Sequence, residues 1–112
     1  MKKIISAFVI LWFAGWSSAS AQMDTVRIQT SAICEQCKDR IEHDLSFEKG
    51  IRTAHLDLNS KVVTVVYNSK KTDAEKIREA IAEIGYDADS IKANPKSYQK
   101  LPSCCKKDSG MH

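Results

Sequence analysis

Residues 24–47 read DTVRIQTSAICEQCKDRIEHDLSF and combine a strand, a loop and a helix in one short stretch. Val26 and Ile28 alternate with polar residues, which is typical of a strand with one buried face. Every fourth residue from position 37 to 45 is apolar, so these residues share one face of a helix. The stretch therefore predicts a strand over 24–30, a loop over 31–36 and a helix over 37–47.

Two cysteines, Cys34 and Cys37, lie where the predicted loop meets the predicted helix. Thiolates are the soft ligands that Cu(I), Zn(II), Cd(II) and Hg(II) favour. The positive end of a helix dipole also lowers the pKa of a nearby thiol. The pair can therefore be interpreted as a metal clamp, a redox pair or a structural disulfide.

The chain from residue 51 to residue 93 adds a hairpin, a second helix and a weak last strand. Apolar residues alternate on both sides of Asn59-Ser60, which predicts two strands joined by a tight turn. Thr72-Asp73-Ala74-Glu75 is a capping box, with Thr72 as the expected cap of the second helix. The resulting order of elements is the split β-α-β pattern, which predicts an α+β, ferredoxin-like βαββαβ sandwich with a four-stranded antiparallel sheet and two helices on one face. The expected elements are strands at 51–58, 61–67 and 87–92 and a helix at 72–84 that Gly85 ends.

Residues 1–21 have the three-part layout of a secretory signal peptide. A short basic start precedes the apolar run 4–16, and small residues lead up to Ala21. The apolar run is too short for a membrane-spanning helix, which needs about 20 residues. We expect cleavage after Ala21 and an exported protein, periplasmic in a bacterium and secreted otherwise, that begins at Gln22.

Charge divides the rest of the chain into two parts. Residues 22–93 hold 11 Lys and Arg against 13 Asp and Glu (net −2), whereas residues 94–112 hold four Lys and one Asp (net +3). No basic stripe with interleaved aromatic residues is present, which argues against a nucleic-acid partner. Asn94-Pro95 interrupts regular structure, so we expect a folded domain over 22–93 and a flexible basic tail over 94–112.

Two further cysteines, Cys104 and Cys105, lie in this tail. Disulfide scaffolds spread their cysteines along the chain, whereas all four cysteines here form two tight local pairs. This spacing favours metal ligation or redox chemistry over stapling. The tail pair could supply auxiliary thiolates to the same ion if the tail folds back, or it could pair with Cys34 and Cys37 under oxidation.

Five short motifs follow one another between residues 24 and 93. They are C-x-x-C at 34–37, I-E-x-x-L at 41–45, G-I at 50–51, V-T-V-x-Y at 63–67 and I-x-x-x-G-Y at 81–86. In this order they resemble the heavy-metal-associated domain of copper chaperones, copper ATPase N-termini and periplasmic mercury-binding proteins. The loop departs from the family's G-M-x-C, because Ala32 stands where a methionine normally packs beneath the loop.

The resemblance implies a metal-binding protein whose ligands are Cys34 and Cys37. Two thiolates that approach from opposite sides suit near-linear Cu(I) or Hg(II), whereas structural Zn(II) takes four ligands. We therefore expect Cu(I) or Hg(II), with Zn(II) or Cd(II) as other candidates. The expected partner is a metal-transporting membrane protein or a metal-acceptor domain that receives the ion by thiolate exchange, and the protein is expected to be monomeric without metal.

Two residues are candidates for supporting the thiolates. Tyr86 follows the second helix, and in the fold that the resemblance implies it lies beside the metal loop, where its ring could shield the sulfurs. Lys38 directly follows Cys37, and its charge could stabilise a thiolate pair.

The main alternative function is thiol–disulfide exchange by the same C-x-x-C. The context of a thioredoxin is missing, because no tryptophan precedes Cys34 and the only prolines, Pro95 and Pro102, lie in the tail. A non-metal interaction module would leave the cysteine pair unexplained. The histidines are scattered and no carboxylate pair accompanies the thiols, so we expect no enzyme.

Overall fold

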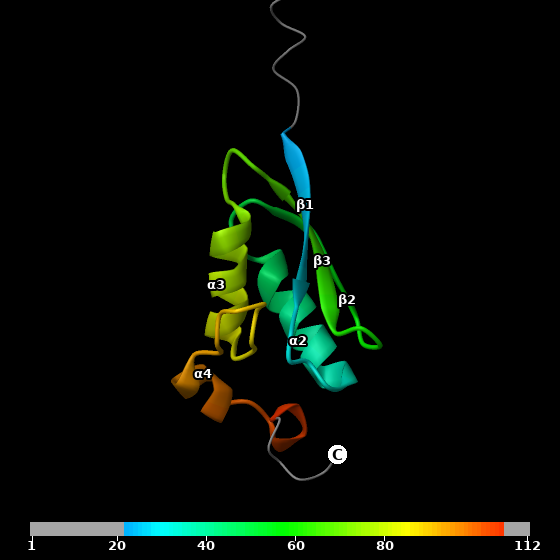
Figure 1. The fold of residues 1–112 in the computed structure, drawn as a ribbon, viewed down its shortest axis with the longest axis vertical. Helices are drawn as coiled ribbons and strands as arrows, with labels where there is room; N and C mark the ends of the chain where they lie inside the picture. The colour runs from blue at the N-terminus through cyan, green and yellow to red at the C-terminus, as the bar shows by residue number, and fades with distance from the viewer. Residues whose placement is uncertain (1–21, 107–112) are drawn as a thin grey trace, which may run out of the picture.

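Three strands form an antiparallel sheet in the order β1-β3-β2 (Figure 1). The computed structural model describes residues 22–106, so the predicted signal peptide lies outside the described residues. In the central strand, alternate residues are buried, as expected for a sheet with one covered face. The strands are β1 (Met23–Gln29), β2 (Ile51–Asp57) and β3 (Val62–Asn68).

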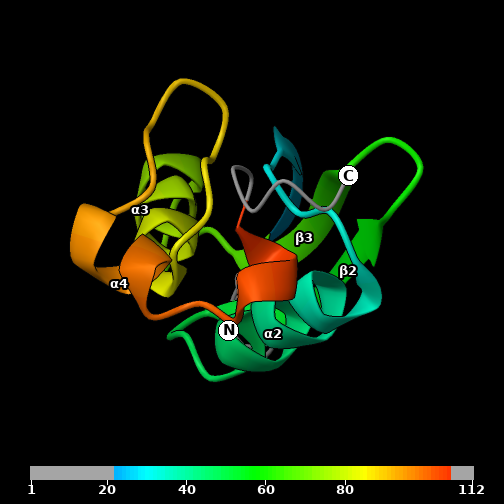
Figure 2. The same cartoon turned by 90° about the horizontal axis from the view of Figure 1, so that it is seen from below.

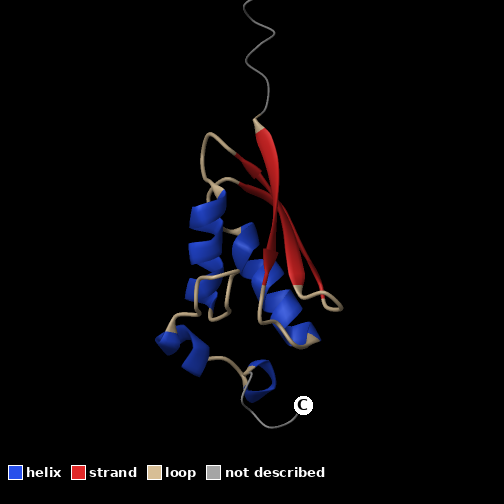
Figure 3. Ribbon diagram, in the orientation of Figure 1, coloured by secondary structure: helices blue, strands red, loops and turns tan. Residues whose placement is uncertain are grey.

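Two helices, α2 (Glu35–Ser46) and α3 (Ala74–Ile84), cover the same face of the sheet (Figure 3). Their apolar stripes pack against the buried side chains of the strands. No helix described between residues 22 and 106 is long and apolar enough to cross a bilayer. The largest fully buried aliphatic side chains of this core are Ile28, Ile41, Leu45, Leu56, Ile77, Ile81, Val63 and Val65.

Both helices begin at positions slightly different from those predicted. Helix α2 starts two residues early, so Cys34 is its N-cap and Cys37 lies inside its first turn. Helix α3 is capped by Asp73 rather than Thr72, because the Asp73 carboxylate accepts a hydrogen bond from the amide of Lys76 at 2.8 Å.

The predicted fourth strand at residues 87–92 is wrong for the described structure. Only isolated bridges form there, between Thr30 and Ala88 and between Ala88 and Ile91. Asp89 adopts a left-handed conformation (φ 53°), which an extended strand does not allow. The Asp89 amide donates to the Gln29 carbonyl at 2.8 Å, but the Gln29 amide donates to the Asp89 carboxylate at 2.9 Å, so a side chain takes one of the two backbone positions of a ladder.

The tail predicted to be flexible has regular structure where the structure describes it, and residues 94–105 fold back onto the domain. The tail forms helix α4 (Pro95–Gln99) and the 3₁₀ turn η2 (Ser103–Cys105). Asn94-Pro95, interpreted above as a break, starts a helix: the Asn94 side chain accepts the amides of Lys96 and Ser97, and proline is well suited to the first helical position.

Gly85 allows the tail to pack closely against the end of α3. Its φ of 124° is accessible to glycine but strained for other residues. A Cβ at this position would lie 3.1 Å from the Ser97 carbonyl oxygen and 3.2 Å from Leu101. Leu101 is only 5% exposed and belongs to the core.

Replacing Leu101 with alanine should therefore destabilise the domain. We expect the free energy of unfolding to fall by about 2–3 kcal/mol, since a buried leucine is lost. Urea denaturation of the reduced chain from residue 22 measures this change. Phe47→Ala is the control, because Phe47 is 78% exposed and its loss should cost under about 0.5 kcal/mol. Equal stability of Leu101→Ala and the parent would contradict a docked tail.

Candidate metal site

Cys34 and Cys37 lie at the N-terminus of α2, where the loop from β1 enters the helix. Their Sγ atoms are 3.3 Å apart, and both thiols are free. Cys37 is fully buried, whereas Cys34 is half-buried. One sulfur is therefore fixed in the core and the other is within reach of solvent.

The loop before α2 is held from two sides. The Thr30 hydroxyl accepts the Ala32 amide at 3.2 Å, and the Ser31 hydroxyl accepts the Asp87 amide at 3.0 Å. The second bond joins the loop to the segment that carries Tyr86. Ala32 is completely buried, so the small side chain that replaces the family's methionine is enclosed by the core.

The tail brings its two cysteines to the same place, and Figure 2 shows the turn η2, in red-orange, next to α2. Cys105 is 1% exposed, and its sulfur is 3.7 Å from that of Cys34. Cys104 is exposed, and its thiol donates a hydrogen bond to the Gln36 side-chain oxygen at 2.7 Å. The Cys34 thiol in turn donates to the carbonyl oxygen of Cys104 at 3.5 Å.

Tyr86 lies beside the thiols, as the resemblance implied. Its side chain is completely buried, and the hydroxyl has no hydrogen bond of full geometry within residues 22–106. Burial raises the pKa of the Tyr86 phenol, and the adjacent thiols of Cys105 and Cys37 raise it further. The hydroxyl therefore stays protonated and can donate to a thiolate that forms next to it.

The Lys38 side chain has a carboxylate partner on its own helix. Its ammonium group forms an ion pair with Glu42 at 3.1 Å, one helical turn further on. The hydrogen bond to Glu42 is the main reason that the pKa of Lys38 is raised. The structure therefore gives the Lys38 ammonium a carboxylate partner on the surface of α2.

The thiols differ in how readily they ionise. Burial raises the pKa of Cys34, but hydrogen bonds from the Cys37 amide and from the thiols of Cys37 and Cys105 outweigh this effect, so the pKa falls below its usual value. Burial raises the pKa of Cys105, and contact with the Cys37 thiol adds to the rise. In the metal-free protein, Cys34 is thus the more readily ionised of the two.

Two residues that help to position the tail cysteines, Gln36 and Leu101, were not identified from the sequence. Gln36 binds Cys104 through its side chain, although nothing in its type distinguishes it from a solvated helix residue. Leu101 anchors the turn that carries the tail cysteines. The available signal was an isolated leucine in a polar tail, three residues before the cysteine pair.

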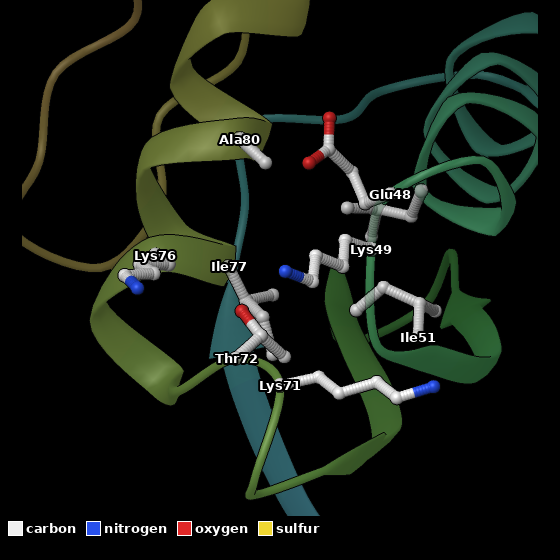
Figure 4. A pocket seen from close by; sticks show the side chains of 9 residues that line it. Glu48, Lys49, Ile51, Lys71, Thr72, Lys76, Ile77 and Ala80 are labelled. Carbon is white, nitrogen blue, oxygen red and sulfur yellow. The ribbon is translucent and has the colours of Figure 1, made fainter.

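A pocket of about 180 Å³ elsewhere on the surface has no cysteine in its lining (Figure 4). It lies between the C-terminal end of α2 and the start of α3, at the opposite end of α2 from the cysteines. Lysine side chains and apolar groups line it, including Lys49, Lys71 and Ile77. The cysteine cluster is therefore the candidate functional site.

The cluster suits a soft metal ion better than a hard one. Its donors are sulfur atoms, which favour Cu(I), Hg(II), Zn(II) and Cd(II). The N-terminus of α2 and the Tyr86 hydroxyl supply the positive partial charge that ionised thiols need. The Sγ atoms of Cys34, Cys104 and Cys105 all lie within 4.8 Å of one another, so one ion can reach several of them.

Comparison with known proteins gives one family. The sequence profile of the heavy-metal-associated domain matches residues 20–87. The "CopZ metallochaperone" structure superposes with a TM-score of 0.56 at 26% identity, covering 58% of this chain and 98% of that one. The water-soluble region of the P-type ATPase CopA from Bacillus subtilis superposes with a TM-score of 0.58 at 28% identity, covering 62% of this chain and 46% of that one.

A curated relative is a copper-exporting P-type ATPase from Staphylococcus aureus (strain JH9). It is 37% identical over 75 residues, which are 66% of this chain. The chain spans only 9% of the length of that ATPase. The similarity thus concerns one domain of a much larger protein. The tail cysteines lie beyond the segment that the family profile matches.

Replacing Tyr86 with phenylalanine should change stability and metal binding in opposite directions. The reduced, metal-free variant should be more stable by about 1 kcal/mol, because a buried hydroxyl without a complete hydrogen bond is removed. Its affinity for Cu(I) should fall, because a donor to the thiolates is lost. Urea denaturation and a Cu(I) competition titration measure the two effects. A gain or a loss in both would contradict the role given to the hydroxyl.

The thiols should also differ in their reaction with iodoacetamide. Cys34 should alkylate at lower pH than Cys105, because a lowered pKa keeps its thiolate populated below the ordinary value of about 8.5. Pulsed alkylation of the reduced chain across a pH series, read by peptide mass spectrometry, gives the order. Faster reaction of Cys105 at every pH would contradict the structure.

Proposed function

Because the chain belongs to the heavy-metal-associated domain family, we propose that it binds one soft metal ion through Cys34 and Cys37 and delivers it to a partner protein. The observation that carries the proposal is the pair of free sulfurs 3.3 Å apart at the start of α2. Cu(I) and Hg(II) are the proposed ions, with Zn(II) and Cd(II) as weaker candidates. The proposal gives the chain no catalytic step, since the metal is its cargo.

Delivery by thiolate exchange follows from the unequal exposure of the two sulfurs. An incoming thiolate of the partner bonds to the ion while the bond to the half-exposed Cys34 breaks, and then the bond to buried Cys37 breaks in turn. The metal keeps its oxidation state, and each released sulfur takes up a proton. The proposed partner is a metal-transporting membrane protein or a metal-acceptor domain, in keeping with similarity to copper-exporting ATPases and a metallochaperone.

We further propose that delivery takes place outside the cytoplasm. The support is the signal-peptide layout of residues 1–21, which lie outside the described residues. The periplasm is the proposed compartment in a bacterium. The chain from Gln22 is then the functional protein, and it is the form to use in binding experiments.

Serine substitution of either cysteine should remove tight binding. We expect Cys34→Ser and Cys37→Ser each to weaken Cu(I) affinity by more than about 100-fold. Loss of a metal ligand lowers the affinity more than loss of a residue that only hydrogen-bonds to a ligand. The reduced chain from Gln22 is titrated with Cu(I) against a competing chelator. Hg(II) and Zn(II) titrations under the same conditions rank the ions.

His55→Gln is the matched control for this titration. The His55 side chain is 77% exposed in β2, so it is a metal-capable group away from the cysteines. Its replacement should leave affinity unchanged. Unchanged affinity in both cysteine variants would refute the proposed site.

The second candidate function is thiol–disulfide exchange. The short distance between the Cys34 and Cys37 sulfurs and the lowered pKa of Cys34 favour it. In that reaction the Cys34 thiolate attacks a partner disulfide, Cys37 resolves the mixed disulfide, and the partner gains two thiols. A reduction potential close to those of disulfide catalysts, together with weak metal binding, would favour this function over metal delivery.

A further inference from the structure

The C-terminal cysteines lie where additional ligands of the same ion would be needed. The Cys105 sulfur is buried and 3.7 Å from that of Cys34, and the Cys104 sulfur is 4.0 Å from that of Cys105. The Cys34 thiol also donates to the Cys104 carbonyl oxygen at 3.5 Å. The sulfurs of Cys34, Cys104 and Cys105 therefore lie within 4.8 Å of one another, and the Cys37 sulfur joins this group through its 3.3 Å separation from that of Cys34.

The spacing within this cluster fits three or four thiolates around one ion. With metal–sulfur bonds of about 2.3 Å, two sulfurs lie roughly 4.6 Å apart around a linear ion and roughly 3.8 Å apart around a tetrahedral one. The separations between Cys34 and Cys37, Cys34 and Cys105, and Cys104 and Cys105 are 3.3, 3.7 and 4.0 Å. These values lie around the tetrahedral spacing and below the linear one.

Several contacts hold the tail cysteines in this position without a metal. Leu101 is buried in the core and lies against Gly85, where only glycine leaves room for it. The turn η2 is closed by the Cys105 amide, which donates to the Pro102 carbonyl at 2.9 Å. The hydrogen bond from the Cys104 thiol to Gln36 fixes the outer cysteine over the first turn of α2.

We propose that Cys105 is the third ligand of the ion and Cys104 the fourth, so that the tail closes a site that Cys34 and Cys37 would otherwise leave open. This inference rests on the proposed metal binding and adds to it. The ions it favours are those that accept three or four thiolates: trigonal Cu(I), and tetrahedral Zn(II) or Cd(II). The proposal concerns coordination and leaves the oxidation state of the metal unchanged.

A closed site changes how the ion leaves. The thiolates of a partner must first displace Cys104 and Cys105, because these ligands occupy the side on which Cys34 is exposed. Each exchange forms one metal–sulfur bond to the partner and breaks one to the tail. The tail cysteines thus compete with the thiolates of the partner for the metal ion, and this competition favours retention of the ion over its rapid delivery.

X-ray absorption spectroscopy of the metal-loaded chain from Gln22 counts the sulfur ligands directly. We expect three sulfurs around Cu(I) and four around Cd(II) in the parent. The Cys104→Ser/Cys105→Ser variant should show two sulfurs around Cu(I). Ser103→Ala, in the same turn but with all four thiols retained, is the matched control and should resemble the parent.

Release of Cu(I) to an excess of a small dithiol gives an independent measure. The double variant should release the ion at least roughly 10–100-fold faster than the parent. Loss of a residue that only supports a metal ligand lowers metal affinity by about this factor, and here two ligands are lost. In the parent, loading with Cd(II), which is expected to bind all four sulfurs, should also protect Cys104, which is exposed without metal, from alkylation. This second measurement needs no substitution in the folded tail.

The outcomes separate the two proposals. Two sulfurs around Cu(I) in the parent, with Cys104 still open to alkylation after Cd(II) loading, would overturn the closed site and leave the two-cysteine site standing. Absence of tight Cu(I) and Cd(II) binding by the parent would overturn both. A parent with three or four sulfurs and a double variant that binds Cu(I) through two would support both.

Discussion

The burial of Cys37 in the apolar stripe of α2 is the constraint on which the site depends. Cys37 shares one helix face with Ile41 and Leu45, and all three are completely buried against the sheet. A reactive sulfur is therefore also a core side chain. The helix cannot rotate to move this sulfur without withdrawing two large side chains from the core. This coupling fixes one sulfur while Cys34, at the N-cap, keeps partial exposure.

The second constraint is the close contact at Gly85. At Gly85, where α3 ends, the backbone lies in close contact with Ser97 and Leu101 of the tail. This contact holds the tail against the end of the domain. The fold thereby converts a pair of adjacent cysteines, poorly suited to bind one ion alone, into neighbours of the first pair. Tyr86, the residue after Gly85, is buried between the two pairs.

Local periodicity explains which parts of the fold were predictable. The hairpin and both long helices follow from apolar spacing within single segments, and their order predicted an α+β fold with helices on one face. The fourth strand failed because Asp89 takes a left-handed conformation and bonds Gln29 with its side chain. This competition depends on a residue 60 positions away in the chain.

The site was predictable to a similar extent. The position of Cys34 and Cys37 at a helix start follows from sequence, and the position of Tyr86 follows from topology. The ion pair of Lys38 with Glu42, one turn further on, was available from the i,i+4 spacing of the two residues. Asn94-Pro95 is compatible both with a chain break and with a helix start, and burial of Leu101 settles which one occurs.

The contact between Cys34 and Cys105 joins residues 71 positions apart, with most of the folded domain between them. Loop-closure entropy opposes such contacts, and terminal segments open at a lower free-energy cost than a central sheet. The tail is therefore the first part of the structure to detach, while β1, β3 and α2 stay folded. Withdrawal of the Cys104 and Cys105 sulfurs from the site then requires local unfolding of only the dozen residues of the tail. The domain that holds Cys37 remains intact during this opening.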